Sequence, residues 1–535
     1  MVKAKVMRRI LKVNVAVLLL LSLLLGGCSG KPKAQPDPTN DNYRAFYQVF
    51  VGSFSDSDGD GVGDIRGIIN RMDYLNDGNM YSEDSLGVQG LWLSPIFESP
   101  SYHKYDATDY YKIDEDFGTE ADLIELIELC HERNVKVILD LVINHTSTSN
   151  VWFSKFANAH KEGNTTDPYY DIYSWAPIDG RTAGLAYTGI PGASLEYYEC
   201  NFSTDMPELN YDNKFVREEM LKVAKYYLDL GVDGFRFDAI KYIYYNDTER
   251  SVDFWKWYMD ELKAYKPDIY CVGECWSGDG ETLQYIEALN CFNFQAAQGE
   301  GYIANAAKGK DINVYTKYIE KYQDQVREAN AAGGMITSFI ANHDMDRAAG
   351  YLTPSTKQAH MAANLYLLCS GSPFIYYGEE VGLKGTRGGA NTDANRRLAM
   401  LWGDEDTIKD PMGTTYDKKK QTNGTVAEQF EDETSLLHYY GKLMSLRKQY
   451  PEIARGDYMA LDFGEDNFGG FLITYEGKQT VLLHNTSTEE IVIDLTTCTG
   501  FPANIKKIVA YIGQGDANLK GTTLTMGPQT SVIIQ

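Results

Sequence analysis

The sequence predicts an α/β protein: a (β/α)8 TIM barrel with a small inserted domain after strand 3 and a C-terminal antiparallel β-sandwich. Short apolar segments alternate with longer stretches of helical periodicity, which is the pattern of βαβ units in a parallel sheet. After residue 450 the pattern changes to short alternating segments, which is typical of an antiparallel module. A chain of 535 residues is long enough for a barrel and an appended domain.

Eight barrel strands are expected, separated by helical stretches. They cover residues 45–51, 90–93, 136–143, 234–237, 270–272, 291–294, 337–340 and 373–376. The third connection, residues 146–213, is far longer than the others and rich in Tyr, Gly and Asp, so it predicts the inserted domain. The barrel then takes residues 43–145 and 214–450, and the β-sandwich takes residues 451–535 with strands near 470–475, 480–485, 490–495 and 531–534.

The first 28 residues predict a targeting segment. A basic start precedes an apolar run, residues 13–25, that is too short for a comfortable membrane span. The closing Leu25-Gly26-Gly27-Cys28 resembles the processing site of bacterial lipoproteins. This implies cleavage before Cys28, a lipid on its sulfur and an extracellular protein anchored to the bacterial membrane; the alternative is an ordinary secretory signal. Pro-rich residues 29–42 are expected to form a tether.

Composition narrows the classes of ligand. The net charge of -25 argues against nucleic acid as a partner. The 39 Tyr side chains offer stacking faces that suit sugar rings, although ordinary packing also uses them. The seven cysteines after Cys28 are odd in number and widely spaced, so they predict buried thiols rather than a disulfide framework.

The chain is organised around residues 234–242, which read as a short buried strand that ends in charge. Arg236 and Asp238 point the same way because side chains on a strand repeat every second residue. A guanidinium beside a carboxylate keeps the carboxylate ionised and oriented, as a nucleophile requires. Taken alone, this stretch also fits a structural Arg–Asp pair at the end of a barrel strand.

Polar residues follow three other predicted strands in the same way. The third strand runs into Asn144-His145, the fifth into Glu274 and the seventh into His343-Asp344. The C-terminal ends of the strands of a barrel converge on one mouth, so these side chains are expected to form one site.

These segments resemble the conserved regions of glycoside hydrolase family 13, the α-amylase family. The resemblance rests on residues 140–145, 205–210, 234–242, 272–276, 339–344 and 371–380, which occur in the order of the family. It covers nearly the whole chain after the tether. It implies that Asp238 is the nucleophile, Glu274 the acid/base and Asp344 the carboxylate that stabilises the transition state.

In a retaining mechanism the first two carboxyl groups lie about 5 to 5.5 Å apart. We expect the negative charges of Asp238 and Asp344 to raise the pKa of Glu274 and keep it protonated near neutral pH.

The resemblance also implies a set of substrate-binding residues, with the Tyr105 ring stacked on the sugar and Lys241 and Trp276 on the side of the leaving group. For Tyr105 plain packing is the alternative. The full set is Tyr105, Asp106, His145, Arg236, Lys241, Trp276 and His343.

Residues 56–64 predict a calcium loop. Carboxylates at alternate positions with interleaved glycines can wrap a hard cation such as Ca²⁺. The expected ligands are Asp56, Asp58, Asp60 and Asp64 with the carbonyl of Val62. The loop lacks the acid at position 12 of an EF-hand, but resembles a calcium loop after strand 1 of several family members; the alternative is a solvated acidic loop.

Two departures from the family pattern, Tyr242 and Glu208, leave a second calcium site at the inserted domain open.

The resemblance implies an α-amylase-type hydrolase that cleaves internal α-1,4 bonds of starch and maltooligosaccharides, and we expect a monomer. The alternatives are an α-glucosidase or oligo-1,6-glucosidase, a transglycosylase, or a non-catalytic glucan-binding protein. All three acids are retained, which argues against the last. Ala239 after the nucleophile, and Tyr102 where exo-acting members tend to carry Asp, favour internal α-1,4 bonds.

Overall fold

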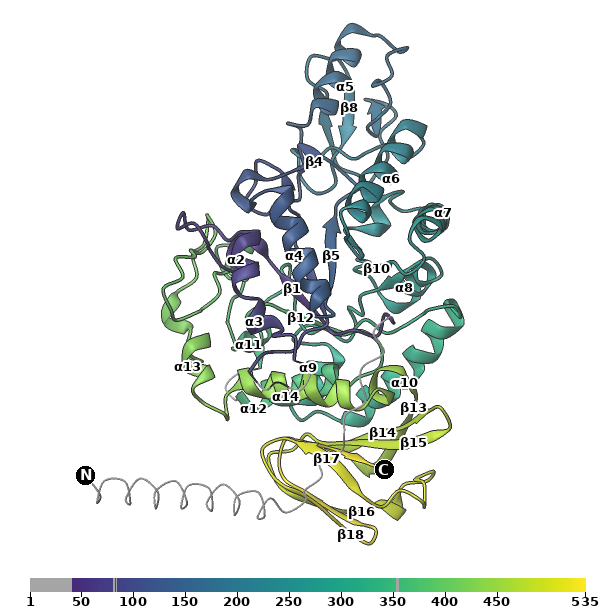
Figure 1. Ribbon diagram of the computed structural model, residues 1–535. Helices are drawn as coiled ribbons and strands as arrows, with labels where there is room; N and C mark the ends of the chain where they lie inside the picture. The colour runs from purple at the N-terminus through teal and green to yellow at the C-terminus, as the bar shows by residue number, and fades with distance from the viewer. Residues whose placement is uncertain (1–40, 80–81, 83, 353–355) are drawn as a thin grey trace, which may run out of the picture. The chain divides into compact units, whose positions relative to one another are not determined.

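The computed structural model describes residues 41–79, 82, 84–352 and 356–535 (Figure 1). The chain divides into two units, Met1–Asp37 and Pro38–Gln535, and every described residue belongs to the second. The predicted targeting segment and residues 29–40 of the predicted tether therefore lie outside the described residues. Among the helices described, none has both the length and the apolar character needed to cross a bilayer.

A curved sheet of parallel strands forms the centre of the barrel, in the spatial order β11-β10-β9-β5-β2-β1-β12. The strands are β1 (Phe46–Val49), β2 (Gly90–Leu93), β5 (Lys136–Leu141), β9 (Gly234–Phe237), β10 (Tyr270–Gly273), β11 (Asn290–Cys291) and β12 (Phe374–Tyr376). Their residues are buried almost throughout, as parallel strands covered on both faces require. Seven of the eight predicted strands are therefore present.

The predicted strand at residues 337–340 is not regular. Thr337 forms a single parallel bridge with Phe292, and the Ser338 carbonyl accepts a hydrogen bond from the Phe374 N–H at 2.8 Å. The segment thus lies between β11 and β12 and continues the sheet with single hydrogen bonds on each side. Both neighbouring strands are only two or three residues long, so they offer little ladder to extend.

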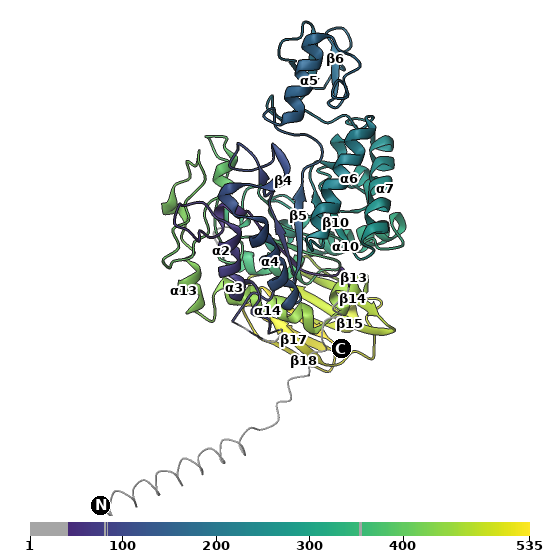
Figure 2. The same cartoon turned by 45° about the horizontal axis from the view of Figure 1, so that its top comes forward.

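Helices surround the sheet (Figures 1 and 2). They are α2 (Ile65–Asn70), α3 (Met72–Leu75), α4 (Glu120–Glu132), α6 (Lys214–Asp229), α7 (Thr248–Tyr265), α8 (Asp279–Ile286), α9 (Tyr302–Ala307), α10 (Ile312–Ala329), α11 (Ala348–Tyr351), α12 (Thr356–Leu367), α13 (Val426–Phe430), α14 (Leu436–Gln449) and α15 (Glu452–Arg455). In α10, buried Ile312, Tyr315, Ile319, Tyr322 and Val326 recur every three or four residues and form the apolar face.

The long third connection, between β5 and α6, carries its own secondary structure. It contains α5 (Val151–Glu162) and a three-stranded antiparallel sheet of β6 (Trp175–Pro177), β8 (Glu196–Glu199) and β7 (Tyr187–Gly189). A bridge between His145 and Glu208, and a hydrogen bond from the Leu209 N–H to the Asn144 carbonyl at 2.9 Å, attach it to the end of β5. A short hairpin, β3 (Phe97–Glu98) and β4 (Asp109–Ile113), precedes α4.

After α15 the chain forms two antiparallel sheets, which confirms the predicted sandwich. One contains β13 (Asp457–Glu465), β14 (Phe468–Tyr475), β15 (Lys478–Asn485), β17 (Ile508–Ile512) and β20 (Thr530–Ile534). The other contains β16 (Ile491–Asp494), β18 (Ala517–Lys520) and β19 (Thr523–Met526). Apolar side chains from both sheets, among them Leu483, Leu524 and Val532, share one buried core.

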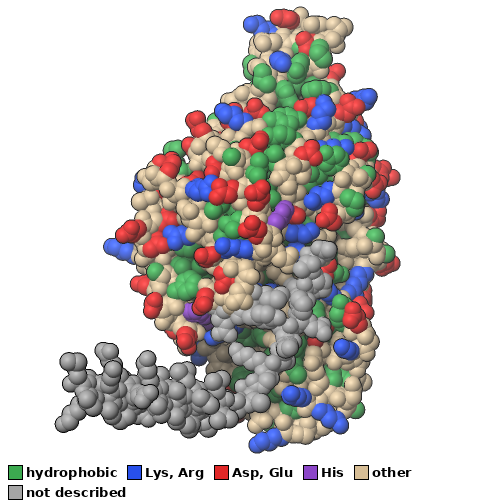
Figure 3. Space-filling view, viewed as in Figure 1, with side chains coloured by type: hydrophobic (Ala, Val, Ile, Leu, Met, Phe, Trp, Pro, Cys, Tyr) green, Lys and Arg blue, Asp and Glu red, His purple; other side chains and the backbone are tan. Residues whose placement is uncertain are grey.

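The seven cysteines of the described residues are buried free thiols, as predicted. On the surface, acidic and basic side chains are interspersed over the face shown in Figure 3.

Candidate active site

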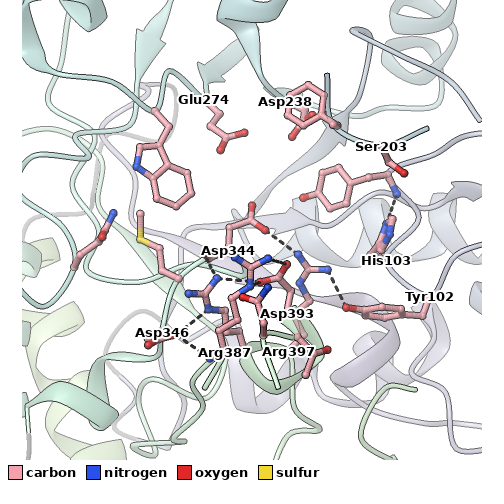
Figure 4. Close-up of a pocket in the computed structure, with 18 of the residues that line it drawn as sticks. Tyr102, His103, Ser203, Asp238, Glu274, Asp344, Asp346, Arg387, Asp393 and Arg397 are labelled. Atoms are coloured by element: carbon pink, nitrogen blue, oxygen red, sulfur yellow. Dashed lines mark hydrogen bonds and ion pairs between the residues drawn. The ribbon is translucent and has the colours of Figure 1, made fainter. Parts of the chain in front are cut away.

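A cleft of about 950 Å³ lies at the C-terminal ends of the barrel strands. Asp238, which follows β9, and Glu274, which follows β10, both line it together with Asp344. In Figure 4 Asp238 and Glu274 lie at the top of the view, Arg387 and Arg397 lie at the bottom, and Asp344 lies between. The three acids predicted from separate strands therefore reach one cavity.

Arg236 joins two of these acids from below. Its Nη1 donates to Asp238 Oδ1 at 2.8 Å and its Nη2 donates to Glu274 Oε2 at 2.6 Å. The same Nη1 donates to both oxygens of Asp140, which pairs with Arg236 across β5 and β9. The guanidinium is fully buried, so these charge-assisted hydrogen bonds are shielded from water. One planar cation thus fixes the orientation of both carboxyl groups.

The backbone turns sharply after the nucleophile candidate. Ala239 adopts the left-handed conformation with φ 48°, which costs a non-glycine residue roughly 1 to 2 kcal/mol. In this conformation its N–H donates to Glu274 Oε2 at 3.3 Å. The strained turn therefore supplies a second donor to the carboxyl group that Arg236 already holds.

Burial controls the pKa of both acids. It raises the pKa of Glu274 to about 7, with Arg236 opposing and the charges of Asp238 and Asp344 adding to the rise. It also raises the pKa of Asp238 to about 6, against the opposing effect of Arg236. The sequence led us to expect that the charges of Asp238 and Asp344 raise the pKa of Glu274; they do, but they are not the main cause. Loss of hydration is the largest cause for Glu274, and the guanidinium does not hold the pKa of Asp238 in its ordinary range.

Asp344 differs from the other two acids. Its Oδ1 accepts from Arg397 Nη2 at 2.8 Å and its Oδ2 lies 3.0 Å from His343 Nε2. Burial would raise the pKa of Asp344, but His343 and Arg397 outweigh it and hold the pKa well below its usual range. The cleft therefore combines a permanent carboxylate with a carboxyl group that titrates near neutrality.

Tyr105 and His145 also line the cleft. The Tyr105 ring stacks on His343 with a centroid distance of 5.3 Å, and its hydroxyl donates to Asp140 Oδ2 at 2.9 Å. Burial lowers the pKa of His145 to about 4, so the ring is neutral. Its Nε2 is buried and has no hydrogen-bond partner within the described chain, which leaves it available to a sugar hydroxyl.

The other predicted residues lie around this set. Arg236 and His343 contact the acids: Arg236 donates to Asp238 and Glu274, and His343 lies against Asp344. Lys241 donates to the Trp276 carbonyl at 3.0 Å, and the Trp276 side chain itself lines the cleft with 42% of its surface exposed. Asp106 is not among the described residues that line the cleft. Its carboxylate accepts from the hydroxyls of Ser99, at 2.8 Å, and Ser101, which connects it to the loop before Tyr105. Its role in substrate binding stays a prediction.

Sequence reasoning missed the role of Arg397. This buried side chain binds Asp344, donates to the Tyr102 hydroxyl at 3.1 Å and donates to the His343 carbonyl at 3.1 Å. It lies in the loop after β12, outside the segments that carried the resemblance. The one sequence signal that could have indicated a role for Arg397 is the pair of adjacent arginines, Arg396-Arg397, in an acidic chain.

The predicted calcium loop brings three of its four carboxylates together. Oxygens of Asp56, Asp58 and Asp64 lie within 4.8 Å of one another, and Asp56 and Asp64 are buried. These hard oxygen donors fit a calcium ion. Asp60 is not part of this group of three, and its carboxylate accepts from the Val62 N–H at 2.7 Å. The Val62 carbonyl stays a predicted ligand.

Comparison with known proteins agrees with this geometry. The family model "Alpha amylase, catalytic domain" matches residues 48–456. "Alpha-amylase 3" of Dictyoglomus thermophilum is 34% identical over 92% of each chain. "4-alpha-glucanotransferase" of Thermotoga maritima is 31% identical over 84% of this chain and 97% of its own, and "Oligo-1,6-glucosidase" of Bacillus cereus is 28% identical over 84% and 91%.

Among solved structures, Eubacterium rectale Amy13B superposes with a TM-score of 0.85 and 34% identity, covering 94% of this chain and 97% of its own. A barrel with acids at its mouth, a family match over most of the chain and this likeness agree: the protein belongs to glycoside hydrolase family 13, the α-amylase family.

Proposed function

We propose that this protein is a retaining α-glucan hydrolase that cleaves internal α-1,4-glucosidic bonds of starch and maltooligosaccharides. The observation that carries the proposal is the Arg236 clamp, which holds Asp238 and Glu274 on adjacent nitrogens of one guanidinium. Retaining glycosidases need their two carboxyl groups close together, because one must attack the anomeric carbon while the other protonates the bond being broken. A clamp of this kind supports the short separation.

The reaction then has two steps. Asp238 attacks the anomeric carbon and the bond to the leaving oxygen breaks, while Glu274 gives its proton to that oxygen. Glu274, now a carboxylate, takes a proton from water, whose oxygen displaces Asp238 from the glycosyl ester. The permanent charge of Asp344 stabilises the positive charge that develops on the sugar. The pKa order supports these roles, since Asp238 ionises at lower pH than Glu274.

Two side chains support a preference for internal α-1,4 bonds. Ala239 places a small side chain beside the nucleophile, and Tyr102 is bound to Arg397 where a carboxylate would hold the hydroxyls of a chain end. The measurement is kcat/KM on maltoheptaose, maltose and isomaltose side by side, with product chromatography on soluble starch. Maltoheptaose should be the best of the three. If maltose or isomaltose were best, the protein would be a chain-trimming glucosidase instead.

A second candidate is glucan transfer, in which a sugar hydroxyl rather than water resolves the glycosyl ester. The exposed Trp276 ring favours it, because it lies two residues after the proposed acid and can stack an acceptor sugar. The relative named 4-alpha-glucanotransferase also points this way. Products longer than the substrate would identify transfer in the same chromatograms.

We also propose that Asp56, Asp58 and Asp64 bind one structural Ca²⁺. When bound, the ion would supply positive charge that fixes the glycine-rich loop after β1. Among the described residues, those of this loop do not line the cleft, which supports a structural role for the ion.

Finally, we propose that the protein is exported and anchored by a lipid on Cys28. The support is the sequence of residues 1–28 alone. In a bacterial host, Cys28→Ala should release the protein from the membrane fraction, whereas Cys498→Ala should not.

A further inference from the structure

A second cavity, of about 410 Å³, lies between the loop that follows β11 and the helices α9 and α10. Its polar lining consists of Gln295, Glu300, Tyr302, Asn305, Lys310 and Asp311. None of these residues belongs to the proposed reaction. The walls carry both signs of charge, amide groups and an aromatic ring, which is the mixture that suits a neutral, hydroxyl-rich ligand.

This cavity adjoins the catalytic cleft. Glu300 lines both, and Gln298 and Gly299 form the cleft wall just before it. The loop after β11 also packs close to the proposed acid in sequence: its Phe294 ring stacks on Trp276, two residues after Glu274, at a centroid distance of 5.0 Å. Trp276 and Glu300 both line the cleft, and Glu300 and Tyr302 both line the second cavity. The family resemblance places Trp276 on the side of the leaving group, so we assign the second cavity to the same side.

Tyr302 forms a rigid platform in the cavity. Its ring stacks on Tyr318 with centroids 4.0 Å apart and an angle of 14°. The Tyr318 hydroxyl is held in turn by Asn293 Oδ1 at 2.8 Å and Asp279 Oδ1 at 3.2 Å. An aromatic ring fixed in this way loses little freedom when a sugar face packs on it.

The backbone around the platform is held in place as well. The Gln298 N–H donates to the Ile340 carbonyl at 3.0 Å, Lys308 donates to the Gly299 carbonyl at 2.6 Å, and the Asn305 amide donates to the Glu300 carbonyl at 2.9 Å. The site is therefore formed before any ligand arrives.

Hydrogen-bonding groups remain available around Tyr302. The side-chain oxygen of Asn305 is buried and has no partner within the described chain. The carboxylate of Glu300 and the ammonium of Lys310 are 3.9 Å apart, beyond hydrogen-bond distance, with 90% and 62% of their side chains exposed. Each can bind a sugar hydroxyl. Val314, 53% exposed on α10, adds an apolar wall.

We propose that this cavity is an outer binding site for an α-1,4-glucan chain on the leaving-group side of the cleft. The inference rests on the proposed function and adds to it: the protein acts on chains long enough to reach Tyr302. The site would also hold an acceptor chain. In that event the acceptor hydroxyl oxygen attacks the anomeric carbon, Asp238 leaves as a carboxylate and Glu274 takes the hydroxyl proton.

The test compares Tyr302→Ala with wild type on maltotriose and on soluble amylose. For amylose, KM should rise about three- to tenfold, the scale of one aromatic contact, with kcat little changed. For maltotriose, kcat/KM should stay within twofold. Tyr302→Phe keeps the ring and should match wild type. Tyr265→Ala, an exposed tyrosine on α7, is the control for loss of a surface ring.

If Tyr302→Ala fails to fold, Val314→Glu narrows the cavity from an exposed position and should raise KM for amylose in the same selective way. Equal effects on both substrates, or no effect on either in folded protein, would overturn the outer site. Wild type that cleaves neither substrate would instead overturn the proposed function, so the two failures are distinct.

Discussion

Arg236 Nη2 lies 2.6 Å from Glu274 Oε2, closer than the 2.8 Å that separates Nη1 from Asp238 Oδ1. The group proposed as the proton donor thus has the shorter contact with a cation, which favours its ionised form. Burial nevertheless raises the pKa of Glu274 to about 7. The balance between burial and the Arg236 charge therefore sets the pH at which Glu274 loses its proton.

The first prediction concerns the pH profile. Turnover needs Asp238 ionised and Glu274 protonated, so kcat/KM should rise with pH through about 6 and fall through about 7. The two acids share one guanidinium, so the two apparent values belong to the pair. Initial rates on maltoheptaose from pH 4 to 9 give the profile. A maximum above pH 8 would contradict the assignment of Glu274 as the acid.

The second prediction is that Asp238→Asn abolishes turnover while fold and glucan binding persist. A neutral amide nearly keeps the shape but cannot form the glycosyl ester, so kcat should fall by at least about 10⁴-fold, on the scale of losing a nucleophile. Asp179→Asn, an exposed carboxylate in the third connection, is the matched control. The melting curve and maltoheptaose binding by calorimetry check the fold. Turnover near the wild-type rate would reject the nucleophile.

The strand ends explain why so much of this site could be predicted. Arg236 lies on β9 and Asp238 directly follows its last residue, while Glu274 follows the neighbouring strand β10. Local sequence and barrel geometry together therefore place all three. Because side chains along a strand alternate between two faces, the two-residue spacing of Arg236 and Asp238 is enough to predict that they point the same way.

Other contacts depend on loops that sequence patterns do not fix. Arg397 meets Tyr102 across 295 positions of the chain, and neither lies on a strand. The motif of Asp106 was visible in the sequence, but its hydrogen bonds to two nearby serine hydroxyls were not. Likewise, the alternation of acids over residues 56–64 does not show that Asp60 lies outside the group of three carboxylates.

The third prediction tests the metal. Calcium that binds only the folded state should raise the free energy of unfolding by about 2.7 kcal/mol at 100 times the dissociation constant, and the melting temperature should rise with calcium concentration. Asp58→Asn should weaken this response because Asp58 belongs to the cluster of three carboxylates. Asp60→Asn should weaken it less, since Asp60 lies outside that cluster. An identical melting curve with and without chelator, and no metal by elemental analysis, would rule the site out.

The fourth prediction concerns a buried acid in the third connection. Glu208 is 3% exposed, and its Oε1 accepts from the Asn201 N–H at 3.1 Å. Asn201 also binds a second acid, because its side-chain amide donates to the carboxylate of Glu199 at 2.7 Å. Burial, and then the charge of Glu199, raise the pKa of Glu208 to about 8. The folded protein therefore holds a proton on Glu208 at neutral pH.

The sign of the stability effect follows from the raised pKa. In the unfolded chain Glu ionises near 4.3, so the folded state binds the extra proton between that pH and about 8. The contribution of Glu208 to stability is present in full below pH 4.3 and is lost as pH rises through about 8. Glu208→Gln stays neutral at every pH and keeps the oxygen that accepts from Asn201. At pH 9 the variant should be more stable than wild type by roughly 1 to 3 kcal/mol and should melt at a higher temperature, whereas at pH 4 the two proteins should melt at the same temperature.

Thermal melts across this pH range, with the exposed Glu162→Gln as control, give the comparison. The same experiment decides whether Glu208 holds an ion. An ionised ligand would make Glu208→Gln less stable than wild type in calcium and would remove one bound metal from the elemental analysis. A protonated Glu208 leaves the metal content of the variant unchanged and gives the stability gain at high pH, because the variant never has to bury a second negative charge beside Glu199.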